Sequence, residues 1–239
     1  MPTVKVGDLD MYYELHGEGE PLVLIGGLAN DLSEWEWMAQ RCAETHRVLA
    51  FDNRGAGRTG KPDIPYSIDM MAADTAGLMT ALGISGATVL GVSMGGKIAL
   101  ALALDNPELV ARLILVSTSA VSRPDNGPTR MEMLMFLGRL FARGKYAQPA
   151  YAQSRQRQAS SAYECIDRLD EIEVPTTIMH GRNDWIAPLR RAEEIREGIA
   201  GSQLVTFRGG HLFFMRKERK WFLDSVESAL AYEIPVRAT

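Results

Sequence analysis

The sequence predicts an α/β fold in which a mainly parallel β-sheet is flanked by helices. Short apolar runs, typical of strands buried on both faces, recur along the chain. Stretches with helical periodicity separate these runs, and this alternation favours parallel strands joined by helical crossovers. The chain of 239 residues is also long enough to bury the core of one sizeable domain.

The first strands are predicted as a hairpin and the later ones as buried strands. Residues 4–15 alternate around Gly7 and Asp8, which is a hairpin pattern. Each later strand is an apolar run bounded by polar or turn-forming residues. These runs are residues 21–27, 46–52, 87–93, 112–119, 175–181 and 202–207.

Helices are predicted between the strands and at the end of the chain. Ser67 is expected to cap the first of them. A second helix spans residues 95–104 and stops before Pro107, and another runs from about Arg216 to Tyr232. The apolar residues expected on one face of the first helix are Ile68, Met71, Ala72, Leu78, Met79 and Leu82.

Residues 120–173 show no strand pattern, although they lie between two predicted strands. Within them, residues 130–144 are rich in methionine and leucine, and methionine suits an accommodating apolar pocket. We therefore expect a single domain over residues 1–239, with residues 120–173 as a helical lid insertion. Met131 and Met135 are predicted to line the substrate pocket beneath this lid.

Charge and composition exclude several function classes. The net charge of −4 and the absence of a basic run argue against a nucleic-acid partner. Two cysteines, Cys42 and Cys165, cannot make a disulfide framework or a zinc site. No segment has the length of a membrane span or the pattern of a signal peptide. We expect a cytoplasmic monomer or homodimer with no membrane partner, no metal and no cofactor.

One glycine-rich stretch, residues 89–97, permits two interpretations. Gly91 and the Gly96-Lys97 pair give most of a phosphate-binding loop, but Ile98 stands where that loop needs a hydroxyl for Mg²⁺. The same residues give G-x-S-x-G around Ser93, the pattern of a nucleophilic serine on a sharp turn. The missing hydroxyl favours the serine.

A second glycine pattern, residues 55–60, matches the dinucleotide fingerprint G-x-G-x-x-G with Asp74 downstream. That site needs a helix to begin at the glycines, but Pro62 and Pro65 follow at once. Asp74 is also expected within a helix rather than at a strand end. A glycine-rich turn after a strand is therefore the better interpretation.

The chain supplies the partners that a nucleophilic serine needs. Asp184 follows the predicted strand 175–181, and His211 follows the strand 202–207. The order Ser, Asp, His is the one found when the serine lies on a strand-to-helix turn. The carboxyl ends of parallel strands meet at one edge of a sheet, so these side chains are expected to lie together there.

The segments GVSMGG, DNRGAGRT, HGRNDWIAP and GGH together resemble the α/β-hydrolase fold superfamily over nearly the whole chain. The resemblance implies that Ser93 is the nucleophile, Asp184 the orienting acid and His211 the general base. It also implies an oxyanion hole made by the backbone N–H groups of Met94 and Leu28. Many relatives have His-Gly where this chain has Gly26-Gly27, so a side chain that normally braces the loop is missing.

This resemblance implies a cofactor-free serine hydrolase that cleaves a small carboxylic ester through an acyl-enzyme, with Trp185 in the substrate pocket. The alternatives are an enol-lactonase, a carbon–carbon bond hydrolase of aromatic degradation, a cofactor-free perhydrolase, or a signalling receptor on a hydrolase scaffold. Three further residues have structural interpretations. His180 is expected to be structural, Arg54 to hydrogen-bond carbonyl groups in its turn, and Lys97 to face outward.

Overall fold

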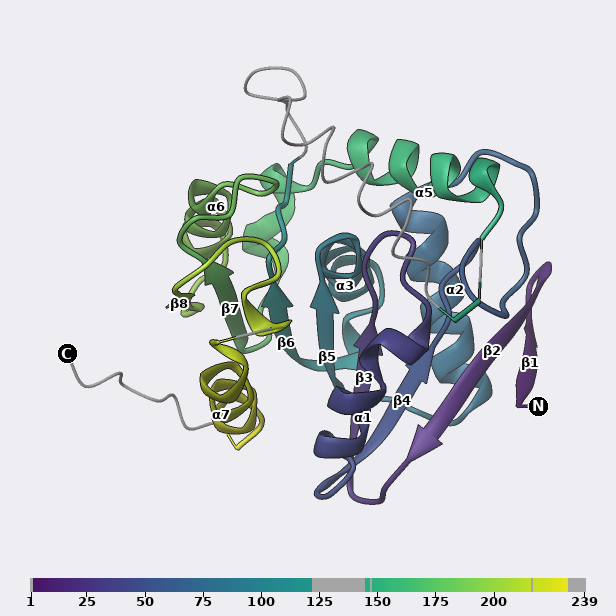
Figure 1. Cartoon of the computed structure of the whole chain (residues 1–239), viewed down its shortest axis with the longest axis horizontal. Coiled ribbons are helices and arrows are strands. Elements are labelled where there is room, and N and C mark those ends of the chain that lie inside the picture. Colours follow the sequence, from purple (N-terminus) through teal and green to yellow (C-terminus); the bar gives the residue numbers. More distant parts are fainter. Residues whose placement is uncertain (1, 122–144, 147, 216, 232–239) are drawn as a thin grey trace.

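The computed structural model describes residues 2–121, 145–146, 148–215 and 217–231, and it confirms the predicted fold class (Figure 1). Within these residues eight strands form one sheet in the order β1-β2-β4-β3-β5-β6-β7-β8. The strands are β1 (Thr3–Val6), β2 (Leu9–His16), β3 (Glu20–Ile25), β4 (His46–Phe51), β5 (Ala87–Val92), β6 (Val110–Val116), β7 (Thr176–Gly181) and β8 (Gln203–Phe207).

The sheet is parallel from β4 to β8 and antiparallel only at its first edge. β2 pairs antiparallel with both β1 and β4, whereas β3 lies parallel between β4 and β5, and β6, β7 and β8 follow in parallel. The predicted hairpin is confirmed, since Val6 pairs with Leu9 across a turn in which Gly7 has φ 55°. Strand β6 ends earlier than predicted, at Val116, because Ser117 has φ 47° and turns the backbone.

The described helices are α1 (Glu36–Cys42), α2 (Ile68–Ala81), α3 (Met94–Asp105), α5 (Ala150–Ala162), α6 (Leu189–Gly198) and α7 (Arg219–Leu230). Short 3₁₀ helices are η1 (Leu32–Trp35), η2 (Pro107–Leu109), η3 (Ile166–Glu171) and η4 (Phe213–Met215). The predicted cap of α2 is confirmed, because the Ser67 hydroxyl accepts a hydrogen bond from the Met70 amide at 3.0 Å. Helix α7 replaces the predicted 216–232 helix, whose end residues lie outside the described ranges.

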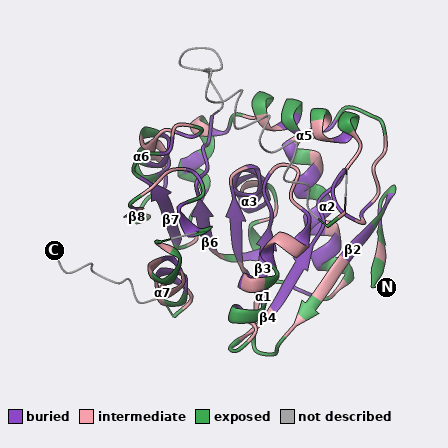
Figure 2. Cartoon of the chain, in the orientation of Figure 1, coloured by how far each residue is buried: buried purple, intermediate pink, exposed green. Residues whose placement is uncertain are grey.

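Two apolar cores lie on opposite faces of the sheet. Alternate residues of one strand enter different cores: Val23 and Ile25 join one, and Leu22 and Leu24 join the other. The first core contains residues of α2, α3 and α6, and the second contains residues of α1, η4 and α7. Both faces of the central strands are therefore covered, as their continuous apolar runs predict, and these strands are largely buried in Figure 2.

Part of the predicted lid insertion is described, and it includes α5. Figure 1 shows this helix across the carboxyl-terminal end of the sheet, above α2 and α3. Val121 and Glu164 form an isolated antiparallel bridge at the base of the insertion. Met131 and Met135 lie outside the described residues, so their place in a pocket stays a prediction, as does the single-domain organisation.

None of the helices that the structure describes is long and apolar enough to cross a membrane. Among the same residues, no three or more His, Cys, Asp or Glu side chains gather in a way that would hold a metal ion.

Candidate active site

Ser93 lies on a sharp turn between β5 and α3. Its backbone has φ 56° and ψ −115°, a conformation that L-residues rarely adopt. Two hydrogen bonds hold it: the Ser93 amide donates to the Val116 carbonyl at 2.9 Å, and the Thr118 hydroxyl donates to the Ser93 carbonyl at 2.7 Å. The flanking Gly91 and Gly95 are required by space, because a Cβ atom at either position would overlap neighbouring backbone atoms. The turn thus presents the hydroxyl at the carboxyl end of the sheet.

His211 reaches this hydroxyl from the loop after β8. Its Nε2 atom lies 2.9 Å from the Ser93 Oγ atom, and its imidazole is buried. The Ser117 hydroxyl donates to the His211 carbonyl at 2.9 Å and fixes the backbone of the loop. An aromatic cluster supports the same loop from the second core; its members are Trp35, Phe207, Phe213, Phe214 and Phe222.

Asp184 completes the hydrogen-bonded chain from the loop after β7. Its Oδ2 atom accepts from the Nδ1 atom of His211 at 2.8 Å, while its Oδ1 atom accepts from the amides of Ile186 at 2.9 Å and Ala187 at 3.0 Å. Burial alone would raise the pKa of Asp184. Hydrogen bonds from His180 and His211 outweigh it and hold the pKa well below its usual range.

An ionised Asp184 fixes the tautomer of His211. The carboxylate only accepts hydrogen bonds, so the Nδ1 atom of His211 carries the proton and its Nε2 atom is left as an acceptor for the Ser93 hydroxyl. The structure therefore brings together the three residues that the sequence singles out, with a lone pair facing the hydroxyl. This arrangement can deprotonate the serine as it attacks an electrophile.

The predicted oxyanion-hole donors are the backbone amides of Met94 and Leu28. Met94 is the first residue of α3, and Leu28 lies in the turn after β3. In the described part of the chain, neither amide donates a hydrogen bond to another protein group. Gly27 brings this turn close to the nucleophile, because a Cβ atom there would be 3.6 Å from the Ser93 Cβ atom.

Sequence reasoning missed the side chains that brace this turn. The Asn53 amide donates to the Gly26 carbonyl at 3.1 Å, and the Gln156 side-chain oxygen accepts from the Ala29 amide at 3.0 Å. Both hydrogen bonds hold backbone groups of this turn. Neither was predictable, because each partner lies 27 or more positions away in sequence.

Two expectations about cationic side chains are wrong. Arg54 bonds carboxylates rather than carbonyls: its guanidinium contacts Asp74 at 2.7 Å and Asp8 at 3.0 Å, because a buried guanidinium needs an opposite charge. Lys97 does not face outward but is 6% exposed, and it donates to the Ser160 carbonyl at 2.7 Å.

Neither rejected glycine pattern forms a phosphate site. The turn at residues 55–60 closes around the buried Asp52 carboxylate, which accepts from the Arg58 amide at 2.7 Å and fills the space beside Gly57. A phosphate has no room where this carboxylate lies. Lys97 of the other pattern is directed at α5 rather than at its own glycine turn.

His180 and Trp185 lie on either side of the Asp184 loop's carboxylate in sequence. His180 is fully buried, and its Nε2 atom lies 2.7 Å from the Ala187 carbonyl and 3.4 Å from the Asp184 carboxylate. It therefore supports the Asp184 loop rather than contacting Ser93. Trp185 is half-buried next to Asp184, and its role in a pocket stays a prediction.

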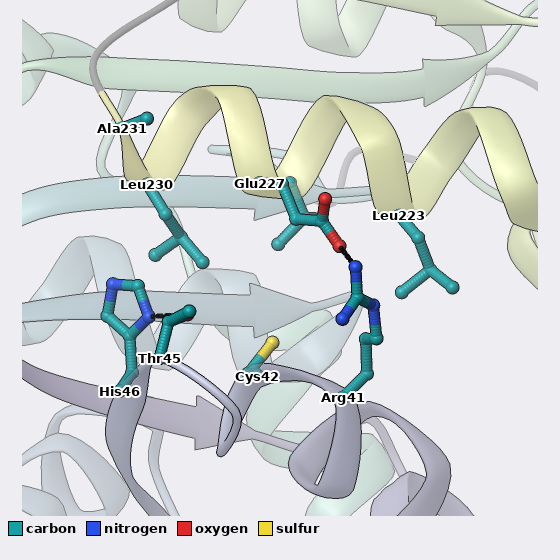
Figure 3. Close-up of a pocket in the computed structure, with 9 residues that line it drawn as sticks. Arg41, Cys42, Thr45, His46, Leu223, Glu227, Leu230 and Ala231 are labelled. Carbon is teal, nitrogen blue, oxygen red and sulfur yellow. Dashed lines mark hydrogen bonds and ion pairs between the residues drawn. The ribbon is translucent and has the colours of Figure 1, made fainter. Parts of the chain in front are cut away.

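A cavity of about 310 Å³ lies between α1 and α7 (Figure 3). His46 in its lining begins β4, whereas Ser93 follows the carboxyl end of β5. Its lining includes Cys42, Leu223 and Leu230, and its charged groups, Arg41 and Glu227, are paired with each other at 2.5 Å. Burial raises the pKa of the Cys42 thiol to about 12, which leaves it unreactive at neutral pH. This cavity is separate from the candidate active site.

Comparisons with known proteins agree with the observed fold. A model of the α/β-hydrolase fold family matches residues 20–148. The putative carbamate hydrolase RutD of Azorhizobium caulinodans is 28% identical, over 89% of this chain and 92% of the relative. The 2-hydroxymuconate semialdehyde hydrolase of a Pseudomonas species is 30% identical, over 80% of each chain. The solved structure of an esterase from Exiguobacterium antarcticum matches with a TM-score of 0.84 at 28% identity, over 96% of this chain and 98% of the esterase.

Proposed function

This chain belongs to the α/β-hydrolase fold family, as its motifs indicate, and on that premise we propose that it is a serine hydrolase that cleaves a carboxylic ester. The single observation that carries the proposal is the hydrogen-bonded chain from Asp184 through His211 to Ser93, with distances of 2.8 and 2.9 Å. These two hydrogen bonds activate the serine hydroxyl, which is otherwise a weak nucleophile.

The reaction proceeds in two halves. In the first, His211 takes the proton of Ser93 as the hydroxyl attacks the ester carbonyl, and Asp184 stabilises the imidazolium that forms. The Met94 and Leu28 amides hold the oxyanion, where one donor contributes about 2.7–4 kcal/mol to the stability of the transition state. The alcohol leaves with the proton from His211. In the second half, His211 activates a water that attacks the acyl-enzyme and releases the acid.

Labelling and turnover together test this function. The wild type should hydrolyse 4-nitrophenyl esters repeatedly, and a fluorophosphonate should add once per chain, at Ser93. Ser93→Ala should abolish both reactions and leave the thermal unfolding curve intact. Ser225→Ala, at a buried serine of α7, is the matched control and should retain both. Label on another residue, or turnover that survives Ser93→Ala, would contradict the proposal.

A second candidate is the hydrolysis of a carbamate, favoured by the relative named as a putative carbamate hydrolase. A carbamate presents the same carbonyl to Ser93 and to the oxyanion donors. The relative named as a semialdehyde hydrolase likewise makes carbon–carbon bond cleavage a further candidate.

A kcat/KM panel of simple esters, carbamates, enol-lactones and vinylogous diketo acids separates these substrates. A signalling receptor would stall after a single turnover, and a perhydrolase would require peroxide as acceptor.

A further inference from the structure

Gln156 occupies an unusual place on α5. The buried residues of this helix are Ala152, Gln156 and Ala159, which recur at helical spacing on its inner face, while the outer face is largely exposed in Figure 2. Gln156 is 0% exposed. Burial of an amide is unfavourable unless its polar atoms form hydrogen bonds, so a buried glutamine on this face requires partners for both its oxygen and its NH₂ group.

Both ends of the Gln156 amide are bonded to backbone groups of two separate loops. Its Oε1 atom accepts from the Ala29 amide at 3.0 Å, and its Nε2 atom donates to the Arg54 carbonyl at 2.7 Å. An amide N–H needs an oxygen partner and a carbonyl needs a donor, so this pairing fixes the orientation of the side-chain amide. Gln156 thus ties the turn after β3 to the turn after β4.

The turn after β3 needs such a tie. The Asn30 amide donates to the Gly27 carbonyl at 3.2 Å, and Ala29, the third residue of the turn, has φ 60°. These are the features of a type II turn, which favours glycine at its third position. Rotation of the peptide between Leu28 and Ala29 would give a type I turn, in which alanine has an unstrained negative φ. The hydrogen bond from the Ala29 amide to Gln156 opposes this rotation, because rotation would bring the Leu28 carbonyl toward the Gln156 oxygen.

The other partner of Gln156, Arg54, is held in place by its own ion pairs. The Arg54 guanidinium is held by Asp74 at 2.7 Å and by Asp8 at 3.0 Å, and Arg54 is 4% exposed. The turn after β4 is therefore fixed independently of α5. A side chain attached to it can hold the less favourable turn at Ala29.

We infer that Gln156 is a positioning residue for the oxyanion hole. Through Ala29 and Arg54 it holds residues 27–30 in the turn that presents the Leu28 amide to the reacting carbonyl. Docking of α5 on the sheet therefore completes the site for an oxyanion. This inference rests on the proposed function, because it requires that Ser93 attacks a carbonyl and that Leu28 stabilises the product of that attack.

Gln156→Met tests the inference, since methionine keeps the length of the side chain and removes both hydrogen bonds. With 4-nitrophenyl acetate we expect kcat to fall about 10- to 100-fold, somewhat less than the loss of a whole oxyanion donor, with KM within about threefold of the wild-type value. The Ki of a trifluoromethyl ketone, which forms an oxyanion on the serine, should rise by the same factor as kcat falls. Gln158→Met, at an exposed glutamine of the same helix, is the matched control and should change neither.

A second substitution separates positioning from general stability. Ala29→Gly removes the preference for the rotated peptide, because glycine adopts positive φ without strain. The double variant Gln156→Met with Ala29→Gly should therefore recover at least threefold of the lost kcat, a rescue that better docking of α5 alone does not produce. If Gln156→Met does not fold, Gln156→Asn serves instead, because its amide is one methylene too short to bond both loops.

The outcomes separate this inference from the proposed function. Wild-type turnover together with an unchanged kcat and Ki in Gln156→Met would overturn the inference and leave the serine hydrolase in place. A loss of kcat that the ketone does not follow, or that Ala29→Gly does not relieve, would likewise overturn it. A wild type that neither hydrolyses esters nor takes label at Ser93 would overturn both.

Discussion

The ammonium group of Lys97 donates a hydrogen bond of 2.7 Å to the backbone carbonyl of Ser160. Lys97 lies one turn after Ser93 on α3, and Ser160 lies in the last turn of α5, where carbonyl groups lack partners within the helix. A positive charge at the carboxyl end of a helix is favourable. The contact therefore joins the helix of the candidate nucleophile to the helix that carries Gln156.

Because Lys97 is buried, we expect the free energy of unfolding to depend on pH in the range where this side chain loses its proton. Burial lowers its pKa to about 8; nearby Cys165 partly opposes this shift and Arg191 adds to it. Between this value and about 10.4, the ordinary pKa of lysine, the unfolded chain holds a proton at this side chain that the folded chain has lost. The wild type should therefore gain free energy of unfolding relative to Lys97→Met as the pH rises from 8 to 10.5, by at most about 1.4 kcal/mol per pH unit.

Urea unfolding of both proteins at several pH values measures this difference. Groups common to the two chains cancel in it. Lys220→Met is the matched control, because Asp224 raises the pKa of that exposed lysine. The wild type should therefore gain no free energy of unfolding relative to Lys220→Met as the pH rises. If the free energy of unfolding of the wild type minus that of Lys97→Met stays level or falls over this range, Lys97 does not lose its proton in the folded protein.

The fold was predictable because its signals are local. Apolar runs mark the buried strands, and Gly7 and Ser67 mark a hairpin and a helix start through contacts within four residues. The order of Ser93, Asp184 and His211 was also visible, because each follows its own strand. Contacts between distant segments were not visible. Lys97 has a carbonyl partner 63 positions away, and Gln156 contacts Ala29 across 127 positions. The nature of these partners decides whether a polar side chain faces water or the interior.

Asp184→Asn should lower turnover about 10⁴-fold, the size of effect that this substitution has in serine proteases. The amides of Ile186 and Ala187 require an oxygen at the position of Oδ1. The new NH₂ group must then face His211 and donate to its Nδ1 atom. This moves the imidazole proton to Nε2, where it meets the Ser93 hydroxyl and blocks proton transfer. Steady-state kinetics on 4-nitrophenyl esters check this, with Asp224→Asn on α7 as the control. A variant with turnover near that of the wild type would place the orienting acid elsewhere.

The same substitution should change the acid sensitivity of the fold. Hydrogen bonds from His180 and His211 lower the pKa of Asp184 below its unfolded value despite burial. The ionised form therefore contributes stability that is complete above about pH 4 and is lost as the pH falls toward the folded pKa. Asp184→Asn lacks this contribution, so its free energy of unfolding should decline less steeply below pH 4. Denaturant unfolding between pH 2 and 6 provides the comparison, and equal slopes for the two proteins would contradict the lowered pKa.

Gly95 lies against the end of β3 and the start of the turn that follows it. A Cβ atom at Gly95 would overlap the Ile25 carbonyl oxygen and lie 2.7 Å from the Gly26 carbonyl oxygen, and both are backbone atoms that cannot rotate away. Gly95→Ala should therefore displace the turn that carries Leu28, lower the free energy of unfolding by several kcal/mol and abolish ester hydrolysis. Gly86→Ala is the matched control. Its φ of 56° also strains an alanine, at about 1–2 kcal/mol, but no atom lies within 4 Å of the new Cβ, so activity should survive. Urea unfolding and kcat/KM of the two variants decide the matter. If Gly95→Ala is no more harmful than Gly86→Ala, the two segments do not pack as closely as the structure places them.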